Sequence, residues 1–242
     1  MMKPYQAIPI DDCGEPLVPI PGDRFDVVQP HPYQALGAPY GDRSPFWLRS
    51  GVLAALTQAQ DRLQQQQPGW KIQVFDALRP LAVQRFMVDY TFLAQVQGRG
   101  WQPETLTPAQ REEVMAEVVQ FWAVPSDDPA TPPPHSTGAA VDVTLVDAAG
   151  VPVAMGSPID EVSPRSHPDH FAASTAIAEQ EFHAHRTRLY QVMRAAGFCR
   201  HPNEWWHFSL GDQLWAWQRR QETGSDKFLA HYGRASVDLG VH

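Results

Sequence analysis

Two short stretches of the chain combine histidine and a carboxylate at spacings that suit a metal ion. In HSTGAAVD (135–142), His135 leaves a proline-rich loop and Asp142 follows seven residues later in an alternating apolar run. In a strand, Asp142 and Thr144 share the face opposite to the valines, and an unpartnered carboxylate there is costly. Histidine and aspartate together supply the nitrogen and oxygen ligands of zinc. Taken alone, this stretch favours a simpler interpretation, a histidine in a turn and an aspartate bonded to the backbone.

The second stretch is NEWWHF (203–208), which places an acid three residues before a histidine. His207 can complete a ligand set with His135 and Asp142 and leave the fourth zinc position open for water, as catalytic sites do. Glu204 beside such a site can take the proton of that water. Without the first stretch, a core strand with an exposed glutamate and a backbone-bonded histidine is the better explanation.

The geometry of this second stretch raises a difficulty. A strand over 204–210 turns Trp205 and His207 to one side and Trp206 to the other. Glu204 then needs a bulge, or a position at the edge of the strand, to reach the same metal as His207.

A third stretch, FDALRP (75–80), places Arg79 in a turn from a strand into a helix. Turns of this kind often carry functional side chains. A fixed cation near a zinc-bound carbonyl stabilises the oxyanion of a tetrahedral intermediate. The alternative, which this stretch alone favours, is a surface arginine paired with Asp76.

Caps and periodicity predict the elements that position these residues. TPAQ (107–110) is a capping box with proline at the first helical position, Pro80 opens one helix and Gly197 ends another. The predicted helices span about 51–66, 80–97, 107–123, 172–196 and 212–221, and the predicted strands 70–75, 139–146, 151–154 and 204–210. Because helices and strands do not alternate regularly, an α+β fold is favoured over a doubly wound sheet.

The predicted architecture is a single domain over 1–242, with a small, mainly antiparallel central sheet flanked by helices and a zinc cleft on the sheet. Residues 1–69 form a proline-rich wrapping segment and the first helix, 70–210 the catalytic core, and 211–242 a last helix and tail. Aromatic side chains alternate with prolines in the wrapping segment. We therefore expect this segment to be ordered and to cover the cleft.

The composition restricts the partners. Hydrophobic residues make up 43% of the chain and charged residues 19%, which suits a substantial core, and the net charge is -8. No basic block is present, so neither nucleic acid nor an anionic membrane is expected as a partner. No long apolar run predicts an export signal or a membrane span, and neither Cys13 nor Cys199 lies in a CxxC pattern. These features predict a cytoplasmic protein with reduced thiols.

The three stretches, in this order, resemble the VanX-type D-alanyl-D-alanine dipeptidases, which belong to the wider zinc D,D-peptidase family. The family pattern is D-A-x-R-P, then S-x-H-x-x-G-x-A-x-D, then E-W-W-H, and this chain has DALRP (76–80), HSTGAAVD (135–142) and EWWH (204–207). Weaker matches are MGSPID (155–160), RSH (165–167) and RLYQVMRAAGF (188–198). One position departs from the pattern, since Pro133 replaces the serine two residues before the ligand histidine.

The resemblance implies hydrolysis of D-alanyl-D-alanine to two D-alanines with one zinc ion per subunit. The implied zinc ligands are His135, Asp142 and His207. Glu204 is the implied general base, and Arg79 is the residue implied to stabilise the oxyanion. Asp160, together with Glu161, is implied to attract the ammonium group of the dipeptide. This charge match favours a free dipeptide over a longer peptide.

Alternatives to this function remain open at this stage. One is a zinc D,D-carboxypeptidase acting on longer peptidoglycan peptides, and another is a non-catalytic binding domain of the same fold. Iron or manganese can replace zinc in such a ligand set. The oligomeric state does not follow from the sequence.

Overall fold

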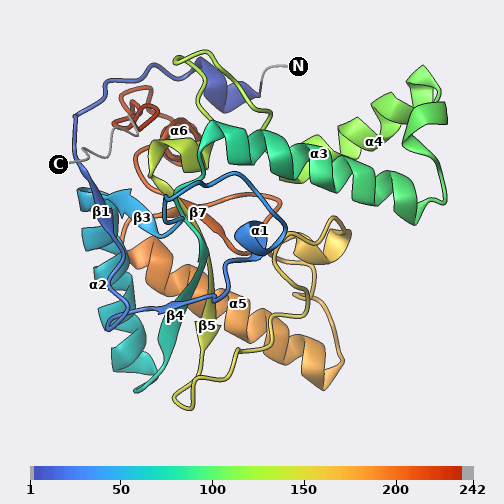
Figure 1. The fold of residues 1–242 in the computed structure, drawn as a ribbon. Coiled ribbons are helices and arrows are strands. Elements are labelled where there is room, and N and C mark those ends of the chain that lie inside the picture. Colours follow the sequence, from blue (N-terminus) through green and yellow to red (C-terminus); the bar gives the residue numbers. More distant parts are fainter. Residues whose placement is uncertain (1–2, 236–242) are drawn as a thin grey trace.

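The computed structural model describes residues 3–235, which fold around a five-stranded sheet (Figure 1). The strand order is β2–β4–β5–β7–β6, and only the β2–β4 pair is parallel. The strands are β2 (Asp26–Val27), β4 (Lys71–Asp76), β5 (Ala140–Val146), β6 (Cys199–Arg200) and β7 (His207–Ser209). A second, two-stranded antiparallel sheet joins β1 (Leu17–Pro19) and β3 (Trp47–Arg49). The predicted α+β fold with a mainly antiparallel sheet is confirmed.

The helices largely follow the predicted caps. The α-helices of the described residues are α1 (Pro32–Ala35), α2 (Ser50–Gln66), α3 (Leu81–Gly98), α4 (Pro108–Phe121), α5 (Ile177–Ala195) and α6 (Gln213–Thr223). The short 3-10 helices are η1 (Pro4–Ala7), η2 (Pro103–Thr105), η3 (Pro134–Thr137) and η4 (Pro164–Ser166). The capping box before α4 forms as predicted, since Thr107 Oγ1 accepts from the amide of Gln110 and Gln110 Oε1 accepts from the amide of Thr107.

One face of the five-stranded sheet is apolar and packs against α2 and α5 (Figure 1). Alternate residues of a strand point to the same face, so the apolar positions of β4, β5 and β7 form one layer. The side chains of this layer and of the helices that cover it include Ile72, Val74, Val141, Val143, Leu145, Phe208, Leu56, Leu63, Leu189 and Val192. Their burial provides the main hydrophobic stabilisation of the sheet.

A second hydrophobic cluster holds α3 and α4 together. These two helices project from the body as an antiparallel arm (Figure 1). Val83 and Val96 of α3 pack with Val114 of α4, and the same cluster includes Tyr33 and Tyr40 of the N-terminal segment. Tyr33 and Tyr40 thus pack the N-terminal segment against the base of this arm.

The strand predicted over 204–210 is wrong in its extent. Only His207–Ser209 is a strand, and the preceding residues form a bend. The amide of Trp205 donates to the carbonyl of Ser166 at 3.0 Å instead of to a neighbouring strand. Hydrogen bonding to β5 therefore begins only at Trp206, whose carbonyl accepts from the amide of Val143 at 3.1 Å.

Two further elements are shorter than predicted. The helix expected from residue 172 begins at Ile177, because the hydroxyl of Ser174 accepts from the amide of Ala176 and competes with helical bonding. The strand expected over 151–154 is reduced to one bridge between Val146 and Pro152, since proline has no amide hydrogen to continue a ladder. Strands β1, β2, β3 and β6 are two or three residues long, too short to show periodicity.

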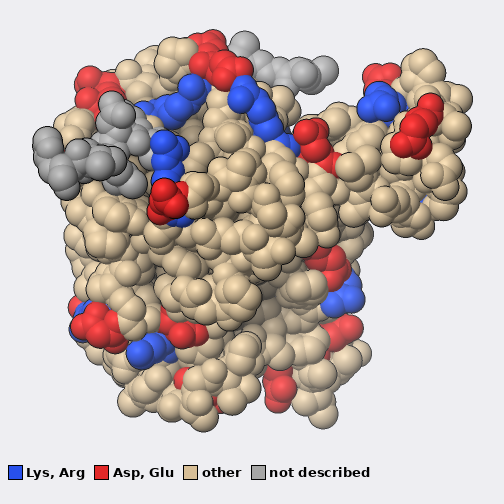
Figure 2. Space-filling model, viewed as in Figure 1, with Lys and Arg blue, Asp and Glu red and all other residues tan. Residues whose placement is uncertain are grey.

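The surface carries interspersed charges. On the face shown in Figure 2, acidic and basic side chains are mixed and separated by broad uncharged areas. Among the described residues, no helix has both the length and the apolar character needed to cross a bilayer. Cys13 is exposed, Cys199 is buried, and both are free thiols as predicted.

Candidate active site

The face of the sheet opposite to the apolar layer carries a row of polar residues. Asp142 of β5 pairs in register with His207 of β7 on one side and with Asp76 of β4 on the other. The register of β4 shifts between Val74 and Asp76, as in a β-bulge, and such bulges re-aim side chains next to active sites. Because of this shift, Asp76 faces the same side as Asp142 although Val74 faces the core.

His135 reaches this row from η3, the short helix that precedes β5. Gly138 ends η3 with a φ of 70°, and a Cβ at this position would lie 2.5 Å from the side chain of Leu17. The turn therefore requires glycine. The imidazole Nδ1 of His135 lies 2.8 Å from the carbonyl oxygen of Ala77, which orients Nε2 toward the sheet.

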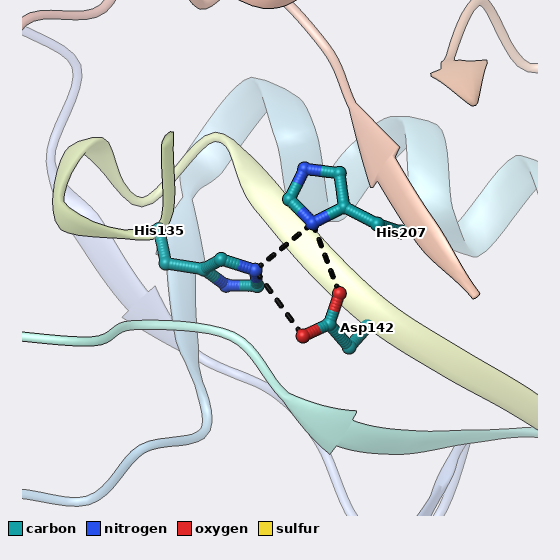
Figure 3. A group of neighbouring side chains, drawn as sticks. All are labelled: His135, Asp142 and His207. Atoms are coloured by element: carbon teal, nitrogen blue, oxygen red, sulfur yellow. Dashed lines mark hydrogen bonds and ion pairs between the residues drawn. The ribbon is translucent and has the colours of Figure 1, made fainter. Parts of the chain in front are cut away.

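The three predicted ligand residues converge, and all are buried (Figure 3). His135 Nε2 lies 3.1 Å from His207 Nδ1 and 3.3 Å from Asp142 Oδ2, and His207 Nδ1 lies 3.0 Å from Asp142 Oδ1. Ligand atoms of a tetrahedral zinc ion are separated by about 3.4 Å, given metal–ligand distances of about 2.1 Å. The observed triangle is within a few tenths of an ångström of that size.

The second nitrogen of His207 is held by a relay from α6. His207 Nε2 lies 3.3 Å from Ser209 Oγ, and the Ser209 hydroxyl donates to Asp212 Oδ2 at 2.8 Å. Because that hydroxyl hydrogen is committed to the carboxylate, Ser209 accepts a hydrogen bond from His207 Nε2–H. The other carboxylate oxygen of Asp212 caps α6 by accepting from the amide of Trp215. The relay thus connects the start of a helix to the orientation of a ligand histidine, as outer-shell partners of metal sites do.

These contacts assign the protons on the two imidazoles. The carbonyl of Ala77 can only accept, so His135 carries its proton on Nδ1, and His207 carries its proton on Nε2. His135 Nε2 and His207 Nδ1, which face each other, are therefore both unprotonated. Each directs a lone pair toward the space beside the carboxylate of Asp142. Burial lowers the pKa of His207, which favours the neutral imidazole. Three buried acceptors around one point fit a bound cation.

Glu204 stands beside this triangle. Its Oε2 lies 3.7 Å from His207 Nδ1, and its Oε1 lies 3.3 Å from His201 Nδ1. Burial, and then the charge of Asp142, raise the pKa of Glu204 well above its usual range. The predicted position at the edge of the strand is confirmed, because Glu204 precedes β7 and is not constrained by its alternation.

The two tryptophans hold this segment, but not as the strand pattern predicted. Trp206, together with Glu204 and His207, lines the cavity, whereas Trp205 Nε1 donates to Ser157 Oγ at 3.0 Å on the far side of the segment. The expectation that Trp205 shares a side with His207 is therefore wrong. Its physical reason is the bend, since strict alternation holds only within a strand.

Arg79 lies in the same buried network. Its Nε donates to Asp76 Oδ2 at 2.8 Å, and its Nη2 lies 3.2 Å from Asp142 Oδ2. The guanidinium carbon is 5.0 Å and 4.9 Å from the ring centres of Tyr33 and Trp122, within cation–π range. Arg79 is 5% exposed, so the alternative of a surface pair with Asp76 is excluded although the pair itself exists.

The two acids predicted to contact substrate lie in different places. Asp160 lines the cavity, and its Oδ2 accepts from the hydroxyl of Tyr33 at 2.7 Å. Burial, and then the charge of Asp142, raise the pKa of Asp160 to about 7. Glu161 lies outside the cavity lining, and its Oε1 is 3.4 Å from Nε of Arg165. The structure therefore brings Asp160, but not Glu161, to the other predicted residues.

The cavity also contains residues that the sequence did not indicate. Its lining includes Lys3, Tyr5, Gln84, Trp122 and His201 besides the predicted residues. Most of them come from segments without regular periodicity, which carry no sequence signal for a site. The relay residue Ser209 is different, because it follows His207 by two residues in a strand and shares its face. That spacing could have identified it.

An α+β fold with a cavity that joins three possible metal ligands to a buried glutamate and an arginine is the arrangement expected of a metallopeptidase. Comparison with known proteins identifies the family. The M15 peptidase family described as D-ala-D-ala dipeptidase matches residues 26–226. The chain belongs to this family of zinc metallopeptidases.

Relatives bear the same description. A D-alanyl-D-alanine dipeptidase of Synechocystis sp. is 51% identical over 239 residues, which cover 96% of this chain and 97% of that protein. The D-alanyl-D-alanine dipeptidase of Enterococcus faecium is 39% identical over 80 residues, covering 33% of this chain and 37% of that protein. Among solved structures, VanYB in complex with D-alanine-D-alanine matches with a TM-score of 0.44 and 17% identity, covering 85% of this chain and 88% of that one.

Proposed function

We propose that the protein is a zinc-dependent dipeptidase that hydrolyses D-alanyl-D-alanine to two D-alanines, with one zinc ion per subunit. The observation that carries this proposal is the convergence of ligand atoms from His135, Asp142 and His207 beside the buried carboxylate of Glu204. The substrate is the one in the names of the relatives. The cytoplasmic location expected from the sequence belongs to the proposal and is testable by cell fractionation.

The chemistry divides between the metal and a base. A zinc ion held by the three ligands would polarise the peptide carbonyl and acidify a water molecule. Glu204 is the base that accepts the proton of the attacking water and then delivers it to the leaving amine. Its burial favours this role, because a carboxylate with a raised pKa is a stronger base than an exposed one.

Arg79 stabilises the negative charge that develops on the carbonyl oxygen. Its guanidinium is held before substrate binds, by Asp76 and Asp142 on one side and by two aromatic rings. Burial opposes ionisation of Asp76, but the adjacent Arg79 lowers the pKa of that carboxyl to about 2, so the pair stays charged. A donor fixed in this way does not have to reorganise during the reaction, and loss of one such donor typically costs about 100- to 1000-fold in rate.

Asp160 binds the ammonium group of the dipeptide. Its carboxylate lines the same cavity as the ligands and is oriented by the hydroxyl of Tyr33. A peptide extended at its amino end would place an uncharged amide against this buried acid, which would leave the carboxylate unpaired. The charge of Asp160 therefore favours a free dipeptide over longer peptides.

The proposal is tested by metal analysis and a substrate panel on the purified protein. We expect about one equivalent of zinc, removal of activity by a chelator and its recovery with zinc. The panel contains D-Ala-D-Ala, L-Ala-L-Ala and a pentapeptide that ends in D-Ala-D-Ala. Preferential cleavage of the first supports the proposal, preferential cleavage of the pentapeptide identifies a D,D-carboxypeptidase, and cleavage of none by the zinc-loaded protein identifies a binding domain.

A further inference from the structure

The N-terminal segment forms a wall of the cavity, although it precedes the region that matches the family. That match begins at residue 26, yet Lys3 and Tyr5 line the same cavity as the proposed zinc ligands. The segment is firmly docked, because Gln213 of α6 donates to the carbonyl of Ile8 at 2.7 Å and the ring of Tyr5 is buried. Lys3 is thus held at the cavity by packed structure.

Lys3 brings a positive charge to the side of the cavity where the base lies. Burial lowers the pKa of Lys3, and the charge of Glu204 partly opposes that effect, so the two groups are close enough to interact. Among the ion pairs of residues 3–235, none includes Lys3. A half-buried ammonium without a partner is costly, and an anion from the substrate would compensate it.

The other strong cation of the described cavity lining is already engaged. Arg79 is bound to the carboxylates of Asp76 and Asp142, and its Nη1 donates to Gln84 Oε1 at 3.0 Å. In the proposed function the same guanidinium also faces the scissile carbonyl, so it does not serve the free carboxylate of the substrate. Lys3 is the cation available to a second charged group of the substrate.

The contacts of the cavity residues fit a dipeptide zwitterion, because Asp160 is linked through Tyr33 and Arg79 to Asp142, whereas Glu204 lies against His207. Asp160 takes the ammonium, the ligand triangle marks the scissile carbonyl, and Glu204 marks the leaving nitrogen. The free carboxylate of a dipeptide is separated from that nitrogen by a single carbon atom, so it falls on the side of Glu204, where Lys3 lies. We propose that Lys3 binds the terminal carboxylate of the dipeptide. This inference rests on the proposed function and adds the residue that recognises the second end of the substrate.

The two charged residues then have separate roles in specificity. Asp160 excludes peptides extended at the amino end, and Lys3 excludes peptides extended or amidated at the carboxyl end. A pentapeptide ending in D-Ala-D-Ala keeps its free carboxylate, so Lys3 does not act against it. Together they restrict the cavity to a molecule with both ends free.

The test compares D-Ala-D-Ala with its C-terminal amide in wild type, Lys3→Gln and Lys3→Arg, with Lys227→Gln as an exposed control of equal charge change. We expect Lys3→Gln to lower kcat/KM for the free dipeptide about 10- to 100-fold, the usual effect of removing a bond to a charged group, mainly through KM. The amide should change less than about threefold. Lys3→Arg should retain most of the preference for the free acid, and Lys227→Gln all of it.

Equal losses on both substrates would overturn the proposal, because they would mean that Lys3 acts through Glu204 or the fold; unchanged kinetics in Lys3→Gln would also overturn it. If wild type cleaves neither compound, the proposed function fails separately. Calorimetric binding of both compounds to the zinc-loaded protein then decides the role of Lys3. If the free dipeptide binds more tightly than its amide and Lys3→Gln removes that difference, the role of Lys3 is supported. If the two compounds bind equally, or neither binds, the role of Lys3 is rejected.

Discussion

The two faces of the central sheet are built from the same strands, but one buries apolar side chains and the other buries charged and polar ones. On one face, Val74, Val143 and Phe208 are fully buried against α2 and α5, and the contacts are mainly apolar. On the other face, Asp142 and His207 are also buried, but Asp142 is held by the charge of Arg79 and His207 by its hydrogen bond to Ser209. Burial of the apolar face stabilises the fold. Burial of the charged and polar groups of the other face is unfavourable, and their mutual contacts must offset that loss of hydration.

This difference shows where the molecule is tolerant. Packing on the apolar face depends on side-chain volume and not on the direction of individual bonds. A change from one apolar residue to another there should therefore affect stability and not the chemistry of the site. The polar face depends on specific atoms, since every acceptor of the ligand triangle is oriented by a further group. A change of one atom there should affect function with little effect on stability. The following predictions test this contrast.

The largest effect is expected for Glu204→Gln on the polar face. The substitution keeps the shape of the side chain and removes the proposed base, so kcat should fall about 100- to 10,000-fold. Zinc content and Tm should remain near those of wild type. Steady-state kinetics on D-Ala-D-Ala and metal analysis check this. The matched control is Glu161→Gln, an acid outside the cavity, which should stay within about twofold of wild type; equal losses in both would contradict the assignment of the base.

Leu145→Ala on the apolar face should produce the opposite result. Removing a fully buried side chain from this layer should destabilise the protein by about 2–5 kcal/mol and lower Tm by about 4–20 °C. The folded fraction should keep its kcat, because Leu145 faces away from the cavity. Thermal unfolding and kinetics below Tm measure both. Thr144→Ser, on the opposite face of the same strand, is the control; a large loss of kcat in Leu145→Ala would show that the faces are not independent.

Ser209→Ala tests whether the relay from α6 orients a ligand. It removes the acceptor of His207 Nε2–H while the ligand itself remains. Loss of such an outer-shell partner typically lowers metal affinity about 10- to 100-fold. Competition with a chromophoric chelator measures that affinity. Ser166→Ala, a buried serine that does not contact His207, should bind zinc as wild type does, and equal affinities for all three proteins would exclude the relay.

The smallest effect is expected in the pH dependence of dipeptide binding. Only ionised Asp160 attracts the ammonium group, and its pKa is raised to about 7, chiefly by burial. Affinity should therefore increase between pH 6 and pH 7 and be about fivefold weaker at pH 6 than at pH 7, whereas near pH 8 the α-amino group of the dipeptide loses its own proton. Calorimetry with the zinc-loaded Glu204→Gln protein measures binding without turnover. Adding Asp160→Asn should abolish the pH dependence, and an unchanged slope would assign it to another group.

Much of the fold could be predicted from local patterns. The capping box at Thr107 and the alternating run of β5 place α4 and the central strand close to their observed bounds. The bend at Trp205 could not be predicted, because the pattern EWWHFSL favours a continuous strand. The bend depends on the carbonyl of Ser166, a distant residue that accepts from the amide of Trp205 in the folded chain. Short strands such as β6 depend on pairing with distant residues, and no local pattern marks them.

Two short stretches of the sequence indicated which kinds of side chain the candidate site contains, since His135 and Asp142 lie in one of them and Glu204 and His207 in the other. Local alternation also indicated which face of β5 is polar. The atoms that face one another, and the position of Lys3 at the same cavity as Glu204, follow only from the packing of the folded chain. These contacts join residues that are far apart in the chain. They depend on how whole helices and strands pack, which the spacing of residues along the sequence does not specify.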